Sequence, residues 1–197
     1  MKIAKFKIEN YRGGYTIIET MIAVSIFLVI VVTGMGALLN ANLLHQKSRD
    51  VLSIMDNLSF IMEDVSKNLR TGYDYHCIDG TASGSITGTD TYSCPEGGAG
   101  ISFKSAVDDS QWVYAIYGDG TIQKSTSGGA PGTFVVLTSS EIEIDVDSGF
   151  SVFGAEPPPG NSMQPFVTIR LAGKITYKNV VTPFSLQTSV SQRAIDI

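Results

Sequence analysis

The chain has 197 residues, of which 43% are hydrophobic and 17% are charged, and its formal net charge is −5 at pH 7. An acidic balance repels phosphate backbones, so the composition argues against nucleic acid as a partner bound through a basic face. The length suffices for one domain with its own hydrophobic core besides a shorter appended segment.

Residues 1–14 form a short polar leader that ends in a glycine pair. Its charged residues are Lys2, Lys5, Lys7, Arg12 and the single acid Glu9. The leader therefore carries a net charge of +3, and the rest of the chain carries −8. Because positively charged flanks stay in the cytoplasm, we expect the leader to be cytoplasmic and everything after residue 40 to be exported.

Residues 15–39 form an apolar run in which Glu19 is the only charged residue. As an α-helix this run would cover roughly 37 Å, against about 30 Å of hydrocarbon in a bilayer. The run therefore predicts a transmembrane helix. A secretory signal peptide would carry its small-residue cleavage site after the apolar run, whereas Gly13 and Gly14 precede it, so we expect the helix to survive processing.

The stretch Gly13-Gly14-Tyr15-Thr16-Ile17-Ile18-Glu19 resembles the class III signal of type IV pilins and type II secretion pseudopilins. The resemblance covers residues 1 to 40, with Tyr15 in place of the commoner Phe and Ile18 in place of a common Leu. It implies that a prepilin peptidase cleaves between Gly14 and Tyr15 and that Tyr15 becomes N-methylated. It also implies that Glu19 is the carboxylate used in assembly.

Glu19 can also be judged on physical grounds. A carboxylate at the edge of a hydrocarbon span costs about 2.5–3.5 kcal/mol, so it needs a partner or an escape to the headgroups. A new α-amino group at Tyr15 would be a cation near an apolar medium, and the Glu19 of a neighbouring subunit would neutralise it. The alternative is that Glu19 only reaches the interface as a snorkelling residue.

Gly34 and Gly36 lie inside the apolar run, where each costs up to about 1 kcal/mol of helix stability relative to Ala. Two interpretations stay open. They can form a close-packing face, as small residues do in membrane helices. They can also mark a segment that melts when a subunit leaves the bilayer for a filament, as the resemblance to pilins implies.

The helical pattern continues through residues 40–70 as an amphipathic segment that we expect to pack on the head. The apolar stripe comprises Leu44, Val51, Met55, Leu58, Met62, Val65 and Leu69. Thr71-Gly72 supplies a stop, so one helix of roughly 55 residues is expected. A coiled-coil stalk would fit the same spacing.

Residues 71–197 form a region rich in Gly, Ser and Thr that we expect to be a β-rich globular head. The predicted strands are Ile101–Phe103, Trp112–Tyr117, Thr121–Lys124, Phe134–Thr138, Glu141–Asp147, Phe166–Leu171, Lys174–Tyr177 and Phe184–Arg193. Gly118-Asp119-Gly120 predicts a hairpin turn, and residues 81–89 a polar loop. A long helix followed by antiparallel strands indicates an α+β, pilin-like architecture.

The head carries a second resemblance, to J-type pseudopilins and W-type minor pilins. It rests on Leu137–Ser140, Phe150–Gly154, Gln164–Val167 and the closing Phe184–Arg193. It implies a low-copy tip or priming subunit. The stretch Pro157–Asn161 is an expected exposed loop with no assigned role.

Cys77 and Cys94 belong to the exported part, where an oxidising compartment permits a disulfide. The pair would close a loop of roughly 18 residues and stabilise the fold by about 3 kcal/mol. Free thiols are the alternative. A metal site is not expected, because two cysteines with only His76 nearby fall short of a zinc ligand set.

We find no catalytic constellation and expect neither an enzyme nor a cofactor. His45 lies on the long helix as a polar-face residue, and His76 beside Cys77 lacks the geometry of a nucleophile pair. The acidic residues Asp108, Asp109, Glu141, Glu143, Asp145 and Asp147 raise the possibility of calcium, which the resemblance permits. Their spacing favours solvated charge, because the last four alternate along a strand.

The sequence thus predicts a minor pilin or pseudopilin, a structural subunit that helps to initiate or cap a type IV pilus or a type II secretion pseudopilus. Its expected partners are the prepilin peptidase, other pilins or pseudopilins through the N-terminal helix, and membrane lipid before assembly; no nucleic acid is expected. Its expected location is the cytoplasmic membrane and then the filament. The alternatives are a filament-displayed adhesin or DNA-uptake module, and a tethered ectodomain that never polymerises.

Overall fold

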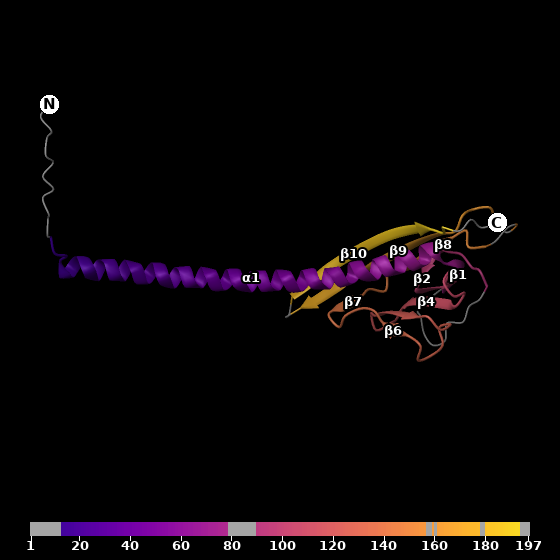
Figure 1. Ribbon diagram of the computed structural model, residues 1–197, viewed down its shortest axis with the longest axis horizontal. Coiled ribbons are helices and arrows are strands. Elements are labelled where there is room, and N and C mark those ends of the chain that lie inside the picture. The colour runs from indigo at the N-terminus through magenta and orange to yellow at the C-terminus, as the bar shows by residue number, and fades with distance from the viewer. Residues whose placement is uncertain (1–12, 79–89, 157–158, 160, 178–179, 194–197) are drawn as a thin grey trace, which may run out of the picture. The chain divides into compact units, whose positions relative to one another are not determined.

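The computed structural model describes residues 13–78, 90–156, 159, 161–177 and 180–193. One helix, α1 (Ile17–Thr71), precedes the strands β1 to β10 (Figure 1). The chain divides into two compact units, Met1–Ser48 and Arg49–Ile197. The second unit contains the end of α1 and all of the strands. The predicted loop at 81–89 lies outside the described residues, as do Pro157, Pro158 and Gly160.

The helix has the bounds that its sequence predicts. No proline interrupts residues 17–71, and the helix spans 55 residues. At its end, the N–H of Gly72 donates to the carbonyl of Asn68 at 2.9 Å. A side chain at position 72 would overlap the ring of Phe103, so glycine lets the chain pass close to this ring as it turns into the head.

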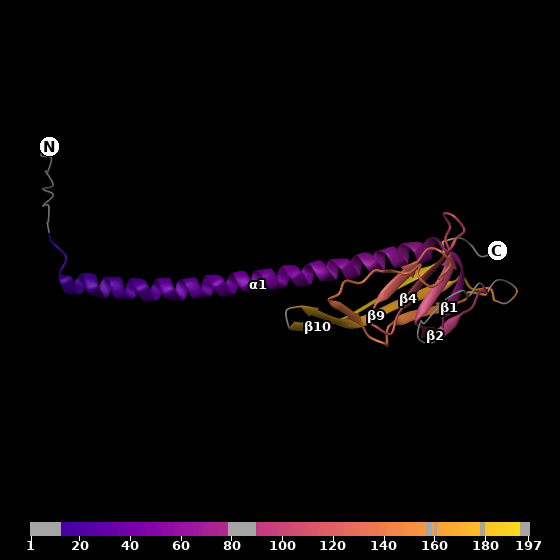
Figure 2. The ribbon, with the colours of Figure 1, turned by 90° about the horizontal axis from the view of Figure 1, so that it is seen from below.

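The strands form two antiparallel sheets with five strands each. The first sheet has the order β1-β3-β4-β5-β6, and the second has the order β10-β9-β8-β2 with β7 paired to β9. The bounds are β1 Tyr73–Ile78, β2 Cys94–Gly98, β3 Gly100–Lys104, β4 Gln111–Ile116, β5 Ile122–Ser125, β6 Val135–Val136, β7 Ile142–Ile144, β8 Gly149–Phe153, β9 Phe166–Tyr177 and β10 Val180–Ser191. The second view shows these strands from below (Figure 2). Helix and antiparallel sheets together make an α+β fold, as predicted.

Three details differ from the sequence-based expectation. The two strands predicted on either side of Gly173 are one continuous strand, β9, because Gly173 lets the backbone of Glu143 approach closely rather than breaking the strand. Strand β10 begins at Val180, four residues earlier than predicted. Strands β1, β2 and β8 were not predicted as strands; β2 has the sequence Cys-Pro-Glu-Gly-Gly, which carries no strand pattern.

The end of α1 packs into the core through one apolar stripe. Its buried members are Ile54, Leu58, Ile61, Val65 and Leu69. Each contributes about 1.5–3 kcal/mol by leaving water. The predicted stripe was displaced by one position at two points: Ile54 is buried whereas Met55 is 36% exposed, and Ile61 is buried more deeply than Met62. A helix has 3.6 residues per turn, so neighbouring positions compete for the same face.

A polar cluster, formed by Asp64, Asn68, Tyr114 and Lys124, fixes this part of α1 to β4 and β5. The Asp64 carboxylate accepts hydrogen bonds from the Tyr114 hydroxyl at 2.7 Å and from Lys124 Nζ at 3.0 Å. Asn68 Nδ2 donates to Asp64 at 2.9 Å and to Tyr114 at 2.8 Å. Lys124 Nζ lies 4.4 Å from the centre of the Trp112 ring. Sequence reasoning did not identify this cluster.

Candidate functional site

The segment around the expected cleavage site is accessible. Residues 13–16 are exposed and precede the first residue of α1, Ile17. No atom lies within 4 Å of the position that a Cβ of Gly14 would occupy, and Tyr15 is 81% exposed. A peptidase needs an unfolded, reachable backbone at the bond it cuts. The Gly14–Tyr15 bond meets that requirement.

Thr16 caps the start of α1. Its hydroxyl accepts a hydrogen bond from the backbone N–H of Glu19 at 3.3 Å, and its carbonyl accepts from Thr20 N–H at 3.2 Å. These bonds satisfy donors that every helix leaves unpaired in its first turn. Sequence reasoning missed this role, although the spacing Thr-x-x-Glu is a known signal for a helix start.

The carboxylate of Glu19 is available for a partner. The side chain is exposed in the first turn of α1, where the positive end of the helix dipole favours a negative charge. Among the described residues it forms no hydrogen bond or ion pair with another side chain. Its position next to Tyr15 brings the two residues implied in assembly to the same end of α1.

The rest of the first unit is an apolar helix whose side chains are exposed. Part of α1 is long and apolar enough to cross a membrane. Apolar side chains point outward all along it: Ile22, Phe27, Val32 and Leu38 are each more than 55% exposed. Gly34 and Gly36 likewise have open space beside them, so both interpretations of these glycines remain. The first unit thus holds one candidate membrane-spanning helix.

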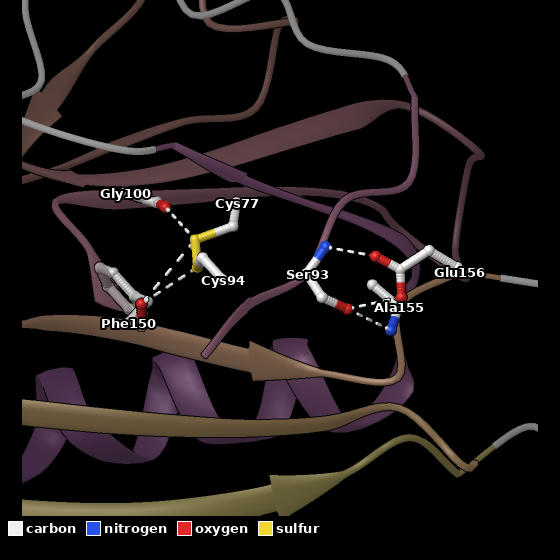
Figure 3. Close-up of a disulfide and its surroundings, with 7 residues drawn as sticks. All are labelled: Cys77, Ser93, Cys94, Gly100, Phe150, Ala155 and Glu156. Atoms are coloured by element: carbon white, nitrogen blue, oxygen red, sulfur yellow. Dashed lines mark hydrogen bonds between the residues drawn. A yellow bond between two sulfur atoms is a disulfide. The ribbon is translucent and has the colours of Figure 1, made fainter. Parts of the chain in front are cut away.

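The two cysteines form a disulfide, as predicted. Cys77 lies in β1 and Cys94 begins β2, their Cα atoms are 5.8 Å apart, and both side chains are buried (Figure 3). The carbonyl oxygen of Phe150 lies 3.8 and 3.5 Å from the two sulfurs. Because the bond holds β1 of one sheet to β2 of the other, it joins the two sheets. This linkage explains how β2 forms without a strand-like sequence.

A carboxylate beside the disulfide holds the start of β2 in place. Glu156 accepts hydrogen bonds from the Ser93 backbone at 2.9 Å and from the Ser93 hydroxyl at 2.7 Å (Figure 3). The hydrogen bonds from Ser93 lower the pKa of Glu156 below its usual value. Ser93 Oγ also accepts from Ala155 N–H at 3.0 Å. This arrangement is structural and was not visible in the sequence.

The other candidate residues do not converge on a site. His45 is exposed on α1, and His76 Nδ1 contacts the carbonyl of Asp90. Within the described ranges, no three His, Cys, Asp or Glu side chains lie together as metal ligands would. Three of the acidic residues have protein partners: Asp108 accepts from Ser110, Asp109 from Tyr73, and Glu143 pairs with Lys174 at 2.9 Å. Asp145 and Asp147 are exposed and lie beyond the end of β7, so the four acidic residues at 141–147 do not alternate along one strand as predicted.

None of three comparisons, with models of protein families, with curated protein sequences and with solved structures, gave a match to this chain.

Proposed function

We propose that this chain is a minor type IV pilin or a pseudopilin, a structural and non-enzymatic subunit of a pilus or a type II secretion pseudopilus. The observation that carries the proposal is the order of features at the start of the chain. An exposed Gly14–Tyr15 bond precedes the candidate membrane-spanning part of α1, and the carboxylate of Glu19, which has no side-chain partner among the described residues, lies in the first turn of that helix.

In this proposal, a prepilin peptidase on the cytoplasmic face cuts between Gly14 and Tyr15 and methylates the new amine. The helix stays in the cytoplasmic membrane until the subunit joins a filament, with the head on the exported side. A disulfide in the head is consistent with export to an oxidising compartment.

Assembly would pair Glu19 of one subunit with the Tyr15 amine of the next. Each charge is costly in an apolar medium, and the two costs offset one another when the groups meet. The exposed apolar side chains of the first unit would then pack against those of other subunits instead of lipid. The resemblance of the head to J-type and W-type proteins supports a role in initiating or capping the filament.

Processing and assembly are tested separately. Intact-mass measurement of the membrane-extracted chain is expected to show a start at Tyr15 with one added methyl group; retention of Met1 in cells with an active peptidase would contradict the proposal. For assembly, the content of sheared filaments relative to membranes is compared for wild type and Glu19→Ala. Asp56→Ala is the matched control, since Asp56 is an exposed carboxylate on the same helix.

Glu19→Ala is expected to insert into membranes as well as wild type or better, because a charge leaves the span, but to be depleted from filaments. Asp56→Ala is expected to behave as wild type in both fractions. Equal incorporation of all three proteins would show that Glu19 is only an interfacial residue, and would favour the tethered ectodomain.

A further inference from the structure

Strand β10 is an open edge of the second sheet. It pairs with β9 on one side over all 12 residues, without a bulge, and no strand of the described chain follows it on the other side (Figure 1). A strand at the edge of a sheet presents a row of unpaired N–H and C=O groups that can pair with another chain.

The register tells which residues of β10 face outward. Gln192 N–H donates to the carbonyl of Pro165 at 3.0 Å, and Val180 is paired with Tyr177 at the other end of the strand. Because hydrogen-bonded positions alternate along an antiparallel pair, the even-numbered residues of β10 bond to β9. The backbone groups of the odd-numbered residues therefore point away from the sheet. Pro183, which has no N–H, occupies one of these outward positions, where a proline is tolerated.

The outward donors beyond this proline have no partner within the described residues. They are the backbone N–H groups of Ser185, Gln187, Ser189 and Ser191. The next outward donor, the N–H of Arg193, bonds to the Arg70 carbonyl at the end of α1 at 2.8 Å. The open row thus ends beside the last turn of the helix.

This edge lacks the usual protection. Proteins commonly guard exposed edges with charged side chains, bulges or prolines. Residues 180–192 contain no charged residue, and Pro183 guards only the beginning of the strand. The segment Ser185–Ser191 remains competent for pairing.

Positive charges surround the end of the open row. A groove of about 650 Å³ lies between the last turns of α1 and the end of β10, and its lining includes Lys67, Arg70, Arg193 and Glu63. The three cations are exposed, and none forms an ion pair with a carboxylate of the described residues. The negative end of the helix dipole favours Lys67 and Arg70, but Arg193 comes from the segment after β10. In a chain of net charge −5, this concentration of positive charge is distinctive.

We propose that an extended, acidic segment of another protein chain binds here by adding a strand to β10. Its backbone would pair with the outward groups of Ser185–Ser191, and its carboxylates would meet Lys67 and Arg193. Within a filament the segment would belong to a neighbouring subunit, but the binding site exists whether or not the chain enters a filament.

The first test uses a fluorescent peptide of about seven residues that alternates glutamate and threonine, a length typical of a strand. Fluorescence anisotropy measures its binding to the full chain in detergent micelles. Matched peptides carry lysine in place of glutamate, or N-methyl groups on alternate residues that block strand pairing. We expect only the unmodified acidic peptide to bind, with protection of the 185–191 amides in hydrogen exchange and weaker binding at high salt.

Variants of the chain test separately the pairing edge of β10 and the positive charge of the groove. Ser189→Pro removes one outward N–H and is expected to weaken binding about five- to tenfold. Ser189→Ala keeps the N–H and is the matched control, expected to bind as wild type. Lys67→Glu is expected to weaken binding, whereas Lys47→Glu, the same charge reversal outside the groove, is not.

Three outcomes would overturn the proposal. The acidic and basic peptides could bind equally, or the N-methylated peptide could bind as well as its parent, a result that does not depend on the folding of any variant. The chain could also self-associate without peptide and become monomeric with Ser189→Pro, which would make a second copy the occupant. Each result leaves the processing and filament tests of Glu19 unaffected.

Discussion

Replacement of Asp64 by Asn is expected to destabilise the head by about 2 kcal/mol. The substitution keeps the size of the side chain but leaves Lys124 without its counter-ion and removes one acceptor from the polar cluster. The side chains of Lys124 and Asp64 are 17% and 29% exposed. The loss therefore falls between that of an exposed ion pair, about 0.2–1 kcal/mol, and that of breaking a buried one, about 3–5 kcal/mol.

Thermal unfolding of the full chain in micelles, followed by tryptophan fluorescence, measures this effect. Trp112 is the only tryptophan, and Lys124 lies over its ring, so its emission reports on the cluster itself. A loss of about 2 kcal/mol lowers the Tm of a domain of this size by about 4–8 °C. Asp56→Asn, the same substitution at an exposed position of the same helix, is expected to change stability by less than about 0.5 kcal/mol.

The pKa of Asp64 determines how the stability difference between wild type and Asp64→Asn depends on pH. Burial opposes ionisation of Asp64, but hydrogen bonds from Tyr114 and Lys124 outweigh it and lower the pKa below the usual 3.8. A carboxylate whose pKa is lower in the folded state contributes stability at pH values above its unfolded-state pKa. That stability is lost as the pH falls through its folded-state pKa. The difference between wild type and Asp64→Asn is thus expected to be constant near neutral pH and to shrink below pH 3.8. A difference that stays the same size at low pH, or an effect no larger than that of Asp56→Asn, would refute the role given to the carboxylate.

Three further predictions concern other parts of the fold. Substitution of both Cys77 and Cys94 by Ala is expected to destabilise the head by about 3 kcal/mol, measured by urea unfolding, with reduced wild type as the comparison. Gly72→Ala is expected to cost about 1–3 kcal/mol in the same assay through overlap with Phe103, whereas Gly34→Ala, with open space around it, leaves the head unchanged. Thr16→Val is expected to weaken the helix start by about 1 kcal/mol, seen as faster amide exchange in the first turn of α1 without a change in head stability.

The helix and the disulfide were predictable because each leaves a local signal. An apolar run without proline defines α1, and two cysteines allow only one pairing within the chain. Strand β2 was not predictable, since its sequence contains Pro95 and two glycines and its structure depends on β8 and on the bond to Cys77. The polar cluster was equally hidden, because Asp64 meets Lys124 and Tyr114 only when residues about 50 to 60 positions apart come together.

Two carboxylates on the same helix illustrate how the fold and the proposed assembly use charge differently. Asp64 receives hydrogen bonds from Tyr114, Lys124 and Asn68, so the fold itself accounts for its presence. Glu19 receives none from the side chains of the described residues, and Thr16 already caps the first turn through the backbone of Glu19. Its carboxylate is therefore not needed to start the helix, yet it borders an apolar segment where a charge is costly. In the proposed assembly a group from outside the chain offsets that cost. The amine that cleavage would create on Tyr15 of a neighbouring subunit is a cation at the corresponding end of α1.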